Sequence, residues 1–197
     1  MADIFATLLK KAAQQNILPA ETQKARNWFR KEAASTSRVT PNSLIKTSSS
    51  TQSTSAIGKM FLFGYMPKLS KKLPYYDRFP LVFPFKQVSD GFYGINLHYL
   101  PLPMRAALMD GLYQYADSDK YDEKTSLSLS YKTLTSAAAS RYYKPCVKHY
   151  LNSQIQTELA LVPANLWDIA LFLPLERFAK ASTSQVHMES RKIIGRN

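Results

Sequence analysis

The chain has 197 residues, of which 45% are hydrophobic, so it is long enough to build one hydrophobic core with an appendage. Its 26 Lys and Arg against 14 Asp and Glu leave a formal net charge of +12, as expected of a protein whose partner is polyanionic. No apolar run approaches the roughly 20 residues of a membrane span, none opens the chain like a signal peptide, and the single cysteine excludes an internal disulfide, so we expect an intracellular protein with no membrane partner.

Residues 1–57 are predicted to form a basic helical arm and a tether. Apolar residues recur at helical spacing in "ADIFATLLKKAAQQ", and "PAETQKARNWFRKEAAS" gives a second helix that begins near Pro19. Ser and Thr dominate residues 35–55, which hold too little apolar surface to offset the entropy of ordering, so we expect a mobile tether there. Residues 1–60 carry 9 Lys and Arg against 3 Asp and Glu, or +6, which is half of the surplus on less than a third of the chain.

Residues 58–181 are predicted to form the core domain. "GKMFLFGYM", "RFPLVFPFKQV" and "FYGINLHYL" are typical of strands. Pro80 and Pro84 lack a backbone N–H, so the second of these is expected at an edge of the sheet or as a bulged, bent strand. Side-chain alternation along it predicts that Phe79, Phe83 and Phe85 share a core-facing side.

The rest of the core is expected to mix helix and strand. "PMRAALMDGLYQYA" predicts an amphipathic helix with an inward face of Met104, Ala107, Leu108 and Leu112. "SDKYDEKT" is expected to be a polar loop, and "SLSLSYKTL" either a half-buried strand or the start of a helix through "TSAAASRYY". "CVKHYL" and "QTELALV" predict two more strands, and the basic tail at 182–197 is expected to be loosely held.

Short strands bent by Gly and Pro, accompanied by a few helices, indicate an α+β fold. We expect a small, bent β-barrel with an N-terminal helical arm, and among barrels an SH3-like topology is favoured.

No residue pattern supports catalysis or a metal site. "DSDKYDEK" lacks the Gly and the Glu of a calcium loop, and no Ser-centred elbow or Gly-rich phosphate loop is present. Cys146 and His149 have a spacing compatible with two zinc ligands, but a structural zinc site needs four. On a strand they would also point to opposite faces, so we expect a buried thiol and a surface imidazole.

Basic residues surround the aromatic run "LPYYDRFPLVFPF" and gather again near residue 144. Lys and Arg neutralise phosphates, and an exposed Tyr ring stacks on an unpaired base. Tyr75 and Tyr76 are neighbours on opposite faces, so one of them should be exposed, and a buried Asp77 would need a polar partner. The candidate DNA-binding residues are Lys68, Lys71, Lys72, Tyr75, Arg78, Arg141, Lys144 and Lys148. The alternative is that the aromatic residues are core and the lysines an ordinary solvated surface.

The phrases "GKMFLFGYMPKLSKKLPYYDRFPLVFPF" and "GFYGINLHYLPLPMRAALMD" resemble the DNA end protector protein family of T-even-like tailed phages and cyanophages. Residues 144–151 and 167–178 support the resemblance, which does not include the Ser/Thr-rich segment.

The resemblance implies a non-enzymatic virion protein bound to the end of the packaged linear double-stranded DNA, near the head–tail connection. It would block the host's end-degrading nuclease, and it would be found in the virion and, during assembly and after genome entry, in the host cytoplasm. Its partners would be the DNA end and portal, neck or tail proteins, with no cofactor and no small-molecule substrate.

The alternative function is a structural connector of the phage neck, tail or baseplate. Its arm would order only on neighbouring subunits, and its charge would balance acidic partners or nearby DNA.

Overall fold

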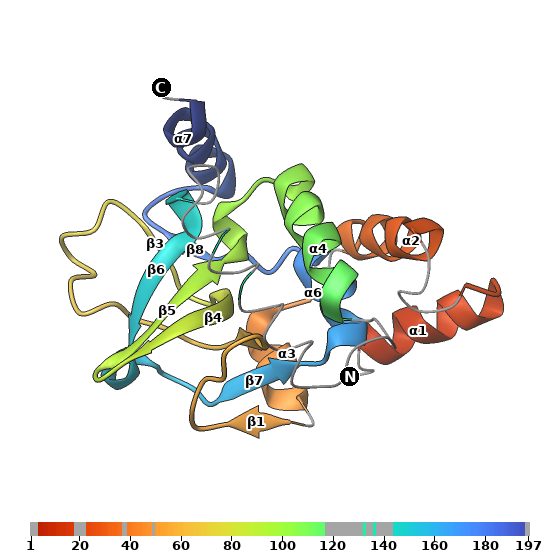
Figure 1. The fold of residues 1–197 in the computed structure, drawn as a ribbon, viewed down its shortest axis with the longest axis horizontal. Helices are drawn as coiled ribbons and strands as arrows, with labels where there is room; N and C mark the ends of the chain where they lie inside the picture. The colour runs from red at the N-terminus through yellow and green to blue at the C-terminus, as the bar shows by residue number, and fades with distance from the viewer. Residues whose placement is uncertain are drawn as a thin grey trace.

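The structure is a computed structural model that describes residues 4–17, 23–36, 39–48, 50–116, 132, 136 and 144–195. Helices and strands are mixed along the chain, which confirms the α+β class. Figure 1 shows the sheet beside a group of helices formed by α1, α2, α4 and α6. None of the described helices has the length and apolar composition needed to span a lipid bilayer.

The main sheet has six strands among the described residues, in the order β1-β7-β2-β4-β5-β6, and every pairing is antiparallel. Its strands are β1 (Thr51–Gln52), β2 (Met60–Leu62), β4 (Leu81–Val88), β5 (Gly91–Asn96), β6 (Val147–Leu151) and β7 (Leu159–Val162). A separate two-stranded pair joins β3 (Tyr76–Asp77) to β8 (Phe178–Ala179). The main sheet is not closed, so the predicted barrel and its SH3-like topology are not confirmed.

The proline-containing strand β4 lies in the middle of the sheet, so the predicted edge position is wrong. The predicted alternative, a bulged strand, is confirmed by the bulge between Pro84 and Lys86. A central position is tolerated because both prolines act through their carbonyl groups. Pro80 O accepts from Phe63 N, and Pro84 O accepts from Gly58 N, each at 3.4 Å. The missing N–H groups fall just before the strand and next to the bulge, where they interrupt little of the ladder.

The two faces of the sheet carry separate apolar clusters because side chains alternate along β2. Met60 and Leu62 belong to the large cluster, which also contains buried side chains of the helices. Phe61 packs on the other face with Phe63 and Tyr65, and that smaller cluster is mostly aromatic. Phe83 is buried in the large cluster and Phe79 and Phe85 pack against it, as predicted.

The Ser/Thr-rich segment differs from the predicted mobile tether. It contains α3 (Pro41–Thr47), and β1 pairs with β7. Thr40 caps α3 by accepting from Ser43 N, and Pro41 opens the helix, a start signal that the Ser/Thr content concealed.

The arm helices α1 (Ile4–Gln14) and α2 (Gln23–Ala34) are present as predicted. Their buried residues Leu8 and Phe29 belong to the same hydrophobic cluster as the sheet. Arg30 of α2 is tied to Asp168 of α6 (Trp167–Phe172) at 2.7 Å. A role for residues 1–57 as a separate arm in the particle stays a prediction.

The helix α4 (Leu102–Ala116) is present, but its predicted inward face is only partly correct. Leu108 is buried and Met104 half-buried, whereas Ala107 is exposed. Arg105 is fully buried instead, where it donates to backbone carbonyls and pairs with Glu176. The side chain of Leu112 and nearly all of residues 117–143, with the predicted polar loop, lie outside the described part of the chain.

The C-terminal tail, predicted to be loosely held, is the helix α7 (Thr183–Gly195) with Val186 buried. Ser182 and Gln185 exchange hydrogen bonds at its start, in the pattern of a capping box. This start signal outweighs the polar composition on which the prediction depended.

Candidate nucleic-acid interface

Three of the predicted DNA-binding residues lie on one loop between β2 and β3. This lysine loop, residues Pro67 to Leu73, carries Lys68, Lys71 and Lys72, all exposed. Ser70 N donates to Pro67 O at 2.9 Å, and the N–H groups of residues 72 and 73 both donate to the carbonyl of residue 69. These turns give the loop a defined backbone, so its three ammonium groups are presented to solvent at little further cost in chain entropy.

Lys180, which follows β8, stabilises the lysine loop through its side chain. Its ammonium group donates to the carbonyls of Ser70, Lys71 and Leu73 at 2.7, 2.9 and 2.9 Å. Its φ of 68° is in the left-handed region that favours glycine, so the backbone strain is offset by these three bonds. The role of Lys180 was not predicted, because nothing in "RFAKAS" indicates a contact about 110 residues away along the chain.

Two further predicted residues, Tyr75 and Lys148, line a cavity of about 130 Å³ beside the lysine loop. Pro67 and Leu73, the two ends of the loop, line it as well. The structure therefore gathers five of the eight predicted residues around one loop and one cavity.

Lys148 of β6 extends over the ring of Tyr99, with its Nζ 4.1 Å from the ring centroid. Burial lowers its pKa, because the charged form loses solvation. It forms no ion pair with any carboxylate in the described part of the chain. A half-buried ammonium group that lies over an aromatic face is suited to an anionic ligand such as phosphate.

Tyr75 is less available for stacking than predicted. Its ring packs against Tyr99 and Phe178, and its hydroxyl is hydrogen-bonded to Glu189 of α7. Burial and the nearby carboxylate raise the pKa of Tyr75 to about 12. Both Tyr75 and Tyr76 are half-buried, so the expectation that one of them is exposed is wrong.

Asp77 is buried, lines the same cavity and has the partners that burial requires. His98 Nδ1 lies 2.7 Å from its carboxylate, and the side-chain amide of Asn96 donates to the same oxygen at 3.1 Å. The other oxygen accepts from Phe79 N. This network fixes the bend before β4, which agrees with the structural role considered for Asp77.

The remaining predicted residues are dispersed. Arg78 is exposed and lines a different cavity, and Lys144 is exposed in the short helix η2 (Lys144–Cys146) that leads into β6. Arg141 lies outside the described residues. Cys146 is buried and His149 exposed, as predicted, and no group of three metal-ligating side chains occurs in the described ranges.

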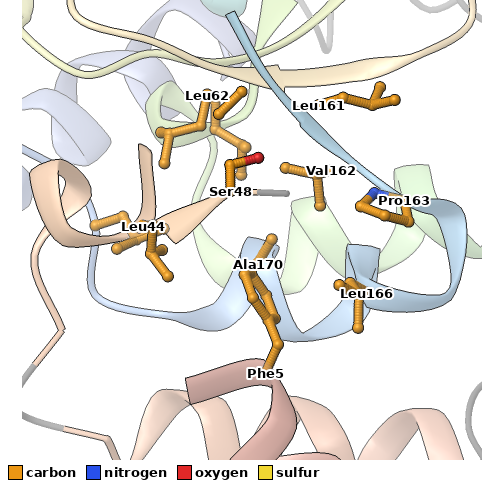
Figure 2. A pocket seen from close by; sticks show the side chains of 12 residues that line it. Phe5, Leu44, Ser48, Leu62, Leu161, Val162, Pro163, Leu166 and Ala170 are labelled. Atoms are coloured by element: carbon orange, nitrogen blue, oxygen red, sulfur yellow. The ribbon is translucent and has the colours of Figure 1, made fainter. Parts of the chain in front are cut away.

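An apolar cavity of about 120 Å³ lies between α1, α3 and β7. Figure 2 shows Phe5 reaching toward Ala170 on one side, with Leu44 and Val162 on the others. None of its lining residues is charged, and Ser48 is the polar one. This cavity does not suit a polyanion, so the candidate interface is the lysine loop with the cavity of Lys148.

The chain was compared with known protein families, curated proteins and solved structures. A family model described as the phage T4 terminal DNA protecting protein matches residues 1–194, which confirms the resemblance found in the sequence. The curated proteins and the solved structures gave no match.

Proposed function

The chain belongs to the phage T4 terminal DNA protecting protein family, and on that premise we propose that it binds the end of the linear double-stranded phage genome and shields it from nucleases. The shielding is steric, and the protein is not an enzyme. The observation that carries the proposal is the lysine loop held beside the cavity of Lys148.

Both parts of this interface suit the phosphate backbone. Lys68, Lys71 and Lys72 supply exposed cations, and Lys148 supplies a partly desolvated one. In the partly buried surroundings of Lys148, a contact with phosphate is stronger than in bulk water. The formal net charge of +12 adds a long-range attraction that accelerates the encounter with DNA.

We further propose that the bound protein resides in the virion near the head–tail connection, in contact with portal, neck or tail proteins. The connector function depends on an arm that orders only on neighbouring subunits. Because α1 and α2 pack in the same core as the sheet, residues 1–57 no longer favour the connector function.

The test is a nuclease-protection assay with purified protein. Linear duplex DNA should be protected from a double-strand exonuclease, and binding should weaken steeply as salt is raised. The triple variant Lys68→Gln, Lys71→Gln, Lys72→Gln should lose most of the protection. A control in which Lys24, Lys59 and Lys86 are replaced by Gln removes the same charge from exposed positions elsewhere and should retain it.

Equal affinity for a linear duplex and for a closed circle of the same sequence would refute end binding. Equal losses in the two triple variants would show that only net charge matters and would remove the lysine loop from the interface.

A further inference from the structure

The lysine loop also carries exposed apolar side chains. Leu69 is 56% exposed and Met66, directly before the loop, is 52% exposed, the two highest values for large hydrophobic residues in the described part of the chain. Leu69 lies next to Lys68 and two positions from Lys71. Two exposed apolar side chains therefore lie within or next to a group of three exposed lysines.

The loop presents Leu69 on a fixed support. The carbonyl of Leu69 accepts from the N–H groups of Lys72 and Leu73, and the ammonium group of Lys180 donates to three other carbonyls of the loop. Figure 1 shows this segment, between β2 and β3, extending away from the sheet at the left of the view. The loop that carries Leu69 therefore extends from the sheet and is preorganised, which lowers the entropy cost of docking.

We propose that the exposed side chains of Leu69 and Met66 pack on the exposed face of the terminal base pair while the lysines of the loop bind the last phosphates of the two strands. The inference rests on the proposed function and names how the end is distinguished from the rest of the duplex. Inside a duplex, both faces of each base pair are covered by stacked neighbours. At an end, one apolar face is open and is flanked by two phosphate backbones, a pattern complementary to an apolar tip among ammonium groups.

The experiment compares a blunt duplex with the same duplex closed at both ends by hairpin loops, which cover the terminal base pairs. The wild-type protein should bind the blunt duplex about tenfold more tightly, because docking on an open end buries roughly one leucine-sized apolar surface. Leu69→Ser should bind both duplexes equally, with the salt dependence unchanged. Met188→Ser, which alters a 49% exposed residue on α7, is the matched control and should behave like wild type.

A second variant tests the same contact in the opposite direction. Leu69→Trp enlarges the stacking surface and should increase the preference for the blunt duplex. A fluorescent adenine analogue at the terminal position should change its emission on binding of the wild-type protein and not of Leu69→Ser, whereas the analogue at an internal position should not respond.

If Leu69→Ser keeps the preference of the wild-type protein for blunt ends, the capping contact is refuted and the protecting function stands. If Leu69→Ser keeps that preference but no longer binds a virion protein that the wild-type protein binds, Leu69 is a protein contact and the inference is equally refuted. If the wild-type protein neither prefers nor protects open ends, the proposed function itself fails.

Discussion

Replacing Lys180 should loosen the lysine loop without unfolding the protein. Its three hydrogen bonds join a charged donor to backbone carbonyls at 2.7 to 2.9 Å. Because Lys180 is exposed, solvent competes for each bond, and a contribution of about 0.5 kcal/mol per bond gives about 1.5 kcal/mol for the set. Lys180→Met should therefore make local opening of the loop about tenfold more frequent.

Hydrogen exchange measures this opening directly. The amides of Ser70, Lys72 and Leu73 donate within the loop, so they should exchange about tenfold faster in Lys180→Met, while amides of β4 and β5 keep their rates. Affinity for DNA ends should fall, because the looser loop has to be ordered on binding. The control is Lys192→Met, which replaces an exposed lysine of α7.

Lys180→Gly distinguishes the effect of the side-chain hydrogen bonds from that of the backbone strain. It loses the same three bonds, so its loop amides should also exchange about tenfold faster. Glycine relieves the cost of the left-handed φ, roughly 1 kcal/mol, so its free energy of global unfolding should lie above that of Lys180→Met. Unchanged exchange at Lys72 and Leu73 in both variants would refute the view that Lys180 holds the loop.

Three further predictions concern groups that are buried or half-buried. Arg30→Met should lower the free energy of unfolding in urea by about 3 kcal/mol, because it removes the guanidinium that faces the buried Asp168, and adding Asp168→Asn should restore part of the loss. Burial lowers the pKa of His187 below 6.5, so the unfolded chain binds more protons than the folded one. The Tm should therefore be constant above about pH 7 and fall as the pH drops through the folded-state pKa. His187→Gln should show a flatter dependence of Tm on pH. Burial raises the pKa of Cys146 to about 12, so an aromatic disulfide reagent should label it only as fast as the protein unfolds, and rapid labelling of the folded protein would contradict this burial.

The sequence was most informative where one local signal acted alone. The period of apolar residues gave α1, α2 and α4, and aromatic segments bounded by Gly and Pro gave β2, β4 and β5. It was misleading where composition and capping disagreed. Residues 35–55 and 182–197 are polar enough to appear unstructured, yet Thr40 with Pro41 and Ser182 with Gln185 start helices there, and buried contacts stabilise them. The central place of β4 was not readable, because strand order depends on pairings between segments far apart in the chain.

The candidate interface divides in the same way, into a part set by neighbours in the sequence and a part set by the fold. Lys68, Lys71 and Lys72 could be predicted together because "KLSKK" places them on one short turn. Lys148 and Lys180 acquire their roles only when β6 and β8 bring them to that turn from distant positions, one as a half-buried cation and the other as the support of the loop. A charge count gives these five residues equal weight, whereas the fold makes them unequal. Three are exposed to solvent, Lys148 is half-buried beside the cavity, and Lys180 donates to carbonyl groups of the protein. Substituting Lys180 should therefore act through the order of the loop, and substituting the other four through the charge that meets the DNA.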